Sequence, residues 1–158
     1  MPAVRFILQY PETHGPDGDM LDAGAPAELA VAAEDAGWRG FAFTEHPVPG
    51  ARWLAAGGHQ ALDPFVALGH VAAVTTELRL LTNLAVAPYR NPFLLAKAAA
   101  TLDRISNGRF VLGVGTGYLK PEFFALGVDF EERNDLFDES LAVCRQVWTG
   151  GPVAVETR

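Results

Sequence analysis

Short apolar runs alternate with longer helical segments four times along the chain. The apolar runs predict four strands: VRFILQY (4–10), GFAFTE (40–45), LRLLTNLAV (78–86) and RFVLGVG (109–115). Each run is followed by a segment that predicts a helix, at residues 26–37, 63–75, 91–106 and 129–150. The strands begin at intervals of roughly 35 residues, which is typical of βα units whose strands run parallel.

Two of the predicted helices begin with the same pair of signals. Asp63 and Asn91 are side chains that cap a helix N-terminus, and each is followed by a proline, which suits the first helical position. The second of these helices is expected to end in a left-handed turn at Asn107 and Gly108. The predicted fold class is therefore α/β with a parallel sheet. The spacing alone leaves open whether the sheet is doubly wound or part of a (β/α)₈ barrel, and both folds bind ligands at the carboxyl ends of the strands.

Composition narrows the class of protein further. The chain has 158 residues, of which 49% are hydrophobic and 20% charged, which is typical of one globular domain. A net charge of -7 argues against a nucleic-acid or anionic-membrane partner. The sequence contains no apolar stretch of about 18 residues and its start does not resemble a signal peptide, so we expect a cytoplasmic protein without a membrane span. The single cysteine, Cys144, is expected to be a core thiol.

His46 is the candidate for acid–base chemistry. It follows the second predicted strand, where an imidazole could face the mouth of the sheet and exchange a proton near neutral pH. The alternative is a loop histidine whose role is structural. His14, His59 and His70 are expected to be structural. Because the histidines lack metal-ligand spacing and the sequence lacks a G-x-S-x-G motif, we expect neither a metal site nor a serine hydrolase.

Three alternating glycines follow the fourth predicted strand. Gly113, Gly115 and Gly117 read G-x-G-x-G, and Tyr118 occupies the position where the dinucleotide fingerprint has its last glycine or alanine. A dinucleotide loop is therefore not expected. Two explanations stay open: the backbone approaches a flat or phosphorylated ligand, or the glycines allow the strand and helix to pack.

Three motifs occur together in the second half of the chain: RNP (90–92), TLDRISNGR (101–109) and GVGTG (113–117). With ELAVAAEDAGWRGFAFTEH (28–46), they resemble the luciferase-like monooxygenase family, the bacterial luciferase-like flavin and deazaflavin oxidoreductases. The resemblance covers nearly the whole chain. It implies a (β/α)₈ barrel of about twice this length, of which residues 1–158, as a single domain, would form the N-terminal half.

The resemblance also implies a cofactor site. The ring of the cofactor is expected against a bulge in the third strand, where the peptide bond between Asn83 and Leu84 would be cis. Gly115, Thr116 and Gly117 are expected to pass beside the cofactor, and His46 to face its reacting edge. Relatives that oxidise a sugar phosphate carry an acid directly after Gly-Thr-Gly, where this chain has Tyr118.

The implied function is that of an oxidoreductase. It would transfer a hydride between the deazaflavin coenzyme F420 and a small organic substrate. One alternative is an FMN-dependent monooxygenase that uses reduced flavin and oxygen, and another is a truncated, inactive half-barrel that needs a partner. Because an open half-barrel exposes strand edges and an apolar interior, we expect a homo-oligomer or association with a missing C-terminal half.

Overall fold

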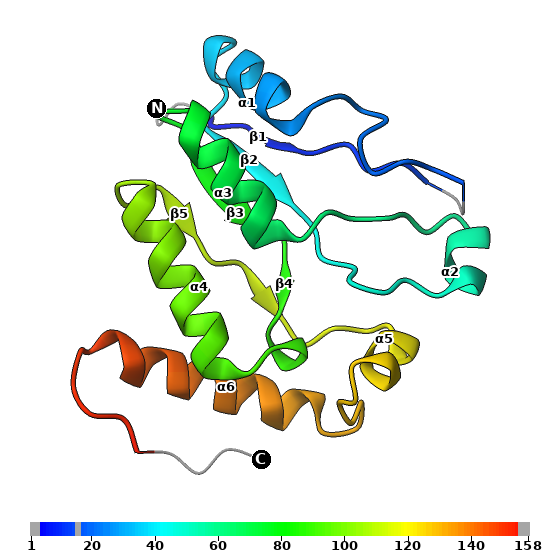
Figure 1. Cartoon of the computed structure of the whole chain (residues 1–158), viewed down its shortest axis with the longest axis vertical. Coiled ribbons are helices and arrows are strands. Elements are labelled where there is room, and N and C mark those ends of the chain that lie inside the picture. The colour runs from blue at the N-terminus through cyan, green and yellow to red at the C-terminus, as the bar shows by residue number, and fades with distance from the viewer. Residues whose placement is uncertain (1–3, 15–16, 155–158) are drawn as a thin grey trace.

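The computed structural model describes residues 4–14 and 17–154, in which a four-stranded parallel sheet is the central element (Figure 1). Its strands in spatial order are β1 (Ile7–Gln9), β2 (Gly40–Phe43), β3 (Arg79–Thr82) and β5 (Phe110–Val111). The register pairs Gly40 of β2 with Ile7 on one side and with Arg79 on the other. The predicted α/β class, with parallel strands that follow one another in chain order, is confirmed.

Helices connect the strands and follow the last of them. They are α1 (Pro26–Asp35), α2 (Ala51–Ala55), α3 (Pro64–Val74), the 3₁₀ turn η1 (Ala87–Tyr89), α4 (Pro92–Ile105), α5 (Lys120–Ala125) and α6 (Arg133–Trp148). Helices α1, α3 and α4 pack side by side in chain order, and α6 packs against α4. Within the described ranges, no helix is both long enough and apolar enough to cross a bilayer.

The helix boundaries agree with the signals in the sequence. Asp63 accepts bonds from two N–H groups of the first turn of α3 at 2.9 and 3.0 Å, and Asn91 accepts one at the start of α4 at 3.0 Å. Asn107 and Gly108 have φ angles of 56° and 77°, so the predicted left-handed turn is confirmed. Helices α2 and α5, of 5 and 6 residues, were not predicted because such short segments show no helical period.

The third and fourth strands are shorter than predicted. Each is divided, and the second pieces, β4 (Ala85–Val86) and β6 (Val114–Gly115), pair in parallel as a separate two-stranded sheet. The continuous strands predicted over 78–86 and 109–115 are therefore wrong in extent. The peptide bond between Asn83 and Leu84 is cis, as the resemblance implied, and it lies where the third strand divides.

Where the strands divide, the side chain of Thr82 takes the place of backbone groups in the hydrogen bonds between the third and fourth strands. The Thr82 hydroxyl donates to the Gly113 carbonyl at 2.7 Å and accepts from the Gly113 N–H at 2.9 Å. A Cβ at residue 113 would lie 2.2 Å from the Thr82 carbonyl oxygen. The first glycine of the GVGTG motif therefore allows two strands to approach, which is the packing explanation.

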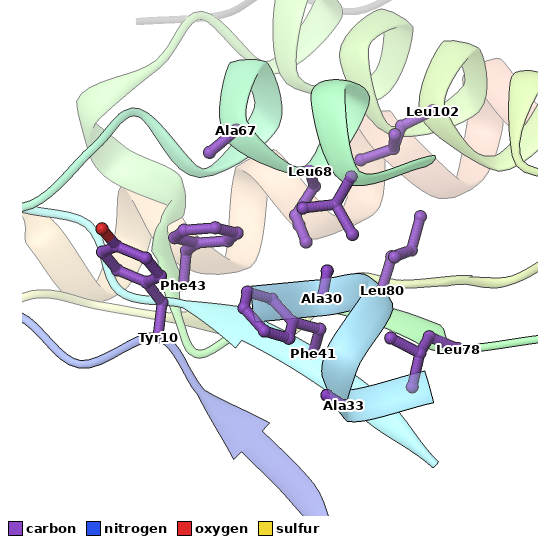
Figure 2. Close-up of a cluster of buried hydrophobic side chains, with 11 residues drawn as sticks. Tyr10, Ala30, Ala33, Phe41, Phe43, Ala67, Leu68, Leu78, Leu80 and Leu102 are labelled. Atoms are coloured by element: carbon purple, nitrogen blue, oxygen red, sulfur yellow. The ribbon is translucent and has the colours of Figure 1, made fainter. Parts of the chain in front are cut away.

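The main core lies between the sheet and helices α1, α3 and α4 (Figure 2). Phe41 and Phe43 are two positions apart on β2, so both rings point to the same face of the sheet, toward the helices. Tyr10 stacks on Phe43 at a centroid distance of 5.1 Å. The other buried members of this cluster are Ala30, Ala33, Ala67, Leu68, Val71, Leu78, Leu80 and Leu102. These side chains together fill the space between the helices and one face of the sheet.

A second cluster joins α4 and α6 around Cys144. Its thiol is fully buried and lies 3.6 Å from the Pro92 carbonyl oxygen, and burial raises the pKa of this thiol. A raised pKa leaves less of the nucleophilic thiolate at neutral pH. The prediction of a core thiol is confirmed.

Glu34 fastens the end of α1 to the turn that precedes β3. Its carboxylate accepts bonds from the backbone N–H groups of Thr76, Glu77 and Leu78, at distances of 2.6 to 3.1 Å. Burial acts to raise the pKa of Glu34, but these bonds and the charge of Arg109 outweigh it, so the pKa is lowered.

We expect Glu34→Gln to reduce the loss of stability in acid. Because the folded-state pKa lies below the unfolded value of about 4.3, Glu34 stabilises the fold above that pH, and this contribution is lost as the pH falls through the folded value. The difference in Tm between pH 7 and pH 3.5 should shrink in the variant. Asp35→Asn, a change of the exposed neighbour, is the control; an equal change in both variants would contradict the prediction.

Two glycine substitutions should have opposite effects on the free energy of unfolding. Gly113→Ala forces a methyl group against the Thr82 carbonyl and should destabilise by about 3 kcal/mol. Gly69→Ala lies in α3 with no atom within 4 Å of the added Cβ, and should stabilise by about 1 kcal/mol through helix propensity. Urea unfolding of both variants measures this, and a neutral Gly113→Ala would show that the close approach is not needed.

Candidate active site

A cavity of about 450 Å³ lies at the carboxyl ends of the strands. It is lined by all six residues predicted from the sequence: His46, Asn83, Leu84, Gly115, Thr116 and Gly117. Two larger hollows, each of about 690 Å³, lie around the start of β1 and between α4 and α6. Because parallel sheets bind ligands at the carboxyl ends of their strands, the 450 Å³ cavity is the candidate active site.

The imidazole of His46 is held on two sides. Its Nδ1 lies 3.3 Å from Oε2 of Glu122, and its ring packs on Trp53 of α2 at a centroid distance of 4.6 Å. Only 9% of the side chain is exposed. Because the carboxylate can only accept, Nδ1 is assigned the proton and Nε2 is left as the basic nitrogen.

Glu122, on α5, is the anchor for this histidine. Its side chain is 1% exposed, and besides His46 it accepts bonds from the Val48 N–H at 3.3 Å and from the Tyr89 hydroxyl at 2.9 Å. Burial and the nearby charge of Glu122 raise the pKa of Tyr89, so the phenol stays protonated and donates. Neither residue was predicted from the sequence: Glu122 lies 76 positions from His46, on a helix too short to recognise.

A buried ion pair lies behind this wall of the cavity. Glu45, next to His46, accepts the Val86 N–H at 2.6 Å and two bonds from the Arg90 guanidinium. Burial raises the pKa of Glu45, while the charge of Arg90 and the Val86 N–H act to lower it. Arg90 also reaches Asp63, the cap of α3, at 2.8 Å. The arginine of the RNP motif therefore joins the end of β2 to the start of α3, and Glu45 joins the end of β2 to β4.

The two residues of the cis peptide bond, Asn83 and Leu84, also line the cavity. The Asn83 amide donates to the Gln9 side chain at 2.9 Å, and Leu84 leaves 40% of its surface exposed. A Cβ at Gly115 would come within 2.7 Å of the Leu84 side chain. At Gly117 the φ angle is +79° and a Cβ would meet Val86 at 2.6 Å. Both glycines therefore serve internal packing, while their backbone borders the cavity.

Two residues that were not among the predicted site residues, His59 and Tyr118, also line the cavity. His59 was expected to be structural, but its ring lies 4.9 Å from that of His46, and Trp53 contacts both rings. Tyr118 is exposed, with its ring 6.1 Å from His46. His14 lies beside His59 at 5.6 Å, whereas His70 is exposed on α3. The sequence around His59 contains no motif, so only the tertiary structure shows that this residue lies at the cavity.

Comparison with curated proteins identifies relatives of two activities. The chain is 37% identical over 135 residues to the F420-dependent glucose-6-phosphate dehydrogenase of Nakamurella multipartita, which covers 82% of this chain and 38% of that protein. It is 37% identical over 97 residues to the pyrimidine monooxygenase RutA of Rhizobium rhizogenes, covering 57% and 26%. An uncharacterized protein of Mycobacterium tuberculosis is 37% identical over 141 residues, covering 78% and 48%. The chain thus spans about half, or less, of the length of these relatives.

Solved structures show the same fold. The monooxygenase RslO1 of Streptomyces bottropensis superposes with a TM-score of 0.84 at 29% identity, over 98% of this chain and 46% of that one. The oxygenating constituent of 3,6-diketocamphane monooxygenase from Pseudomonas putida, solved with FMN, gives 0.82 at 22% identity, over 99% and 43%. The luciferase-like monooxygenase family model matches residues 6–158. The chain therefore belongs to the luciferase-like monooxygenase family, whose members are oxidoreductases and monooxygenases.

Proposed function

We propose that this chain forms the His46 side of the active site of an oxidoreductase that transfers a hydride between a deazaflavin, coenzyme F420, and a small organic substrate. The observation that carries the proposal is the convergence of six predicted residues on one cavity, one of which is a histidine whose imidazole is held by a buried carboxylate. The F420-dependent dehydrogenases, at 34 to 37% identity, support a deazaflavin.

The residues that line the cavity suit a flat ring. Leu84 presents an exposed apolar side chain at the bulge, and the segment from Gly115 to Gly117 crosses the cavity with only one side chain, that of Thr116. Asn83, Leu84 and this segment would hold the ring between them. When bound, a deazaflavin supplies the hydride acceptor or donor, and the protein supplies its position.

His46 would exchange the proton that accompanies the hydride. Its Nε2 is the free basic nitrogen, and Glu122 on Nδ1 stabilises the imidazolium that forms when Nε2 takes up a proton. Tyr89 and the Val48 N–H keep the Glu122 carboxylate in place. The chain's own contribution is therefore to orient one imidazole and to hold a proton at a defined atom.

The second candidate is an FMN-dependent monooxygenase. It is favoured by the pyrimidine monooxygenase among the relatives and by the structural match to RslO1. A flavin has a nitrogen where a deazaflavin has a carbon, so the cofactor decides whether oxygen is activated. Titration of the purified protein with F420 and with FMN, followed by visible absorbance, distinguishes the two; tighter binding of FMN would favour the monooxygenase.

The edges of the sheet are an argument that this chain associates with a partner. Strands β1 and β5 lie at the two edges of the four-stranded sheet, and Phe6 and Ile7 are exposed at the start of β1. Unpaired edges and exposed apolar side chains favour association. We expect a second copy or further βα units to cover them, so that the chain alone would be an inactive half-barrel. Light scattering that shows a stable monomer with cooperative unfolding would contradict this.

The His46→Ala variant should separate chemistry from folding. We expect it to lower the turnover rate by roughly 10²-fold, because a positioned acid or base is lost, with little change in Tm. Gly115→Val should instead weaken cofactor binding, because its side chain displaces Leu84 from the cavity wall.

Cofactor affinity and turnover are measured on each variant of the full-length protein. His70→Ala, a change of an exposed histidine on α3, is the matched control and should alter neither quantity. If His46→Ala keeps full turnover, or loses only stability, His46 is a structural loop histidine and its catalytic role must be withdrawn.

A further inference from the structure

A second histidine faces the candidate active site from a different part of the chain. His59 lies in the loop between α2 and α3, and it lines the same cavity as His46, with the two rings at 82° to each other. The loop is fastened to the segment after β1 by a bridge between His14 and His59 and by a bond of 2.9 Å between Nδ1 of His14 and the Gly57 carbonyl. Gly58 packs against the Trp53 ring, where an added Cβ would come within 2.3 Å. The position of His59 is thus specified by several contacts.

The ring nitrogens of His59 have distinct surroundings. Nδ1 lies 3.1 Å from the Gln60 carbonyl oxygen and 3.6 Å from Oε2 of Glu12. Both neighbours are acceptors, so Nδ1 is assigned the proton and Nε2 is the basic nitrogen, as in His46.

Glu12 is well placed to act on this imidazole. Its side chain is 12% exposed, and its other oxygen accepts the Thr44 hydroxyl at 2.5 Å and the Gln9 amide at 3.3 Å. Gln9 in turn accepts the Asn83 amide. Glu12 is thereby held by side chains from the ends of β1 and β2, and its remaining oxygen faces His59. The cavity therefore carries two imidazole–carboxylate pairs, His46 with Glu122 and His59 with Glu12.

We propose that His59 is a second catalytic base of this cavity and that Glu12 is its positioning residue, so that the substrate is an alcohol oxidised to a carbonyl compound. This rests on the proposed hydride transfer to a deazaflavin. As the carbon of the alcohol gives up its hydride to that oxidant, the O–H bond breaks, its proton forms a bond to Nε2 of His59, and the electron pair completes the C=O bond. The proton that His46 would exchange is then the one that the reduced deazaflavin takes up. Glu12 stabilises the imidazolium that results. In the opposite direction the same imidazolium returns the proton.

The first test needs neither cofactor nor substrate. In the full-length protein labelled with ¹⁵N-histidine, NMR should find the neutral ring of His59 protonated at Nδ1. Glu12→Gln should shift the Nδ1 resonance of His59 and leave that of His46 unchanged. A His59 ring protonated at Nε2, or one that does not respond to Glu12→Gln, would overturn the pairing.

The second test measures oxidation of probe alcohols: glucose 6-phosphate, 2-propanol and cyclohexanol. With the deazaflavin bound, bleaching of its absorbance reports hydride transfer. His59→Gln should lower kcat by roughly 10²-fold with the cofactor Kd unchanged, and Glu12→Gln should lower kcat by roughly 10-fold. The matched control, His70→Gln, should have no effect, and equal Tm values would confirm that the variants fold.

The outcomes separate this inference from the proposed function. If the protein binds a deazaflavin and His46→Ala abolishes its chemistry, but His59→Gln keeps full turnover, only the second base is overturned. If the protein binds a deazaflavin and oxidises none of the probe alcohols, the alcohol as substrate class is overturned while the cofactor proposal stands. If no deazaflavin binds, the proposed function fails, and the inference fails with it.

Discussion

The buried carboxylate of Glu45 is the interaction on which the candidate active site depends. It lies at the end of β2, directly before His46, in a position where an unpaired charge would be costly. The Val86 N–H and the Arg90 guanidinium compensate that cost, and both belong to the segment that follows the cis peptide bond. The segment therefore turns across the end of β2, where it becomes a wall of the cavity.

Arg90 and its neighbours also constrain His46, the candidate acid–base residue. Tyr89, next to Arg90, donates to Glu122, and Glu122 in turn accepts from His46. The orientation of one imidazole thus depends on contacts between segments far apart in the sequence, at β2, at η1 and at α5. Substitutions at Glu45 or Arg90 should therefore alter the orientation of His46 indirectly, through Tyr89 and Glu122.

The two ends of the sheet have different roles. At the amino ends of the strands, Glu34 fastens α1 to the turn before β3, and Arg109 donates to the carbonyls of Ala72, Leu78 and Ser106. These contacts are made within the fold and connect the helices to the sheet. At the carboxyl ends lie both imidazole–carboxylate pairs. This division follows the rule for parallel βα folds, in which one end of the strands carries stability and the other carries chemistry.

The sequence by itself determined the order of the elements and one side of the site. Apolar runs, capping residues such as Asp63 and the left-handed turn at Gly108 act over a few positions, so they can be read locally. His46, Asn83 and the residues from Gly115 to Gly117 were found because strand ends and family motifs mark them.

Only the tertiary structure decided where β3 and β5 stop, because the Thr82 hydroxyl makes the hydrogen bonds to Gly113, 31 positions away, that a strand's backbone would otherwise make. It also decided the partners of His46 and His59, because Glu122 and Glu12 reach them through short or irregular segments, and such long-range contacts leave no pattern along the chain.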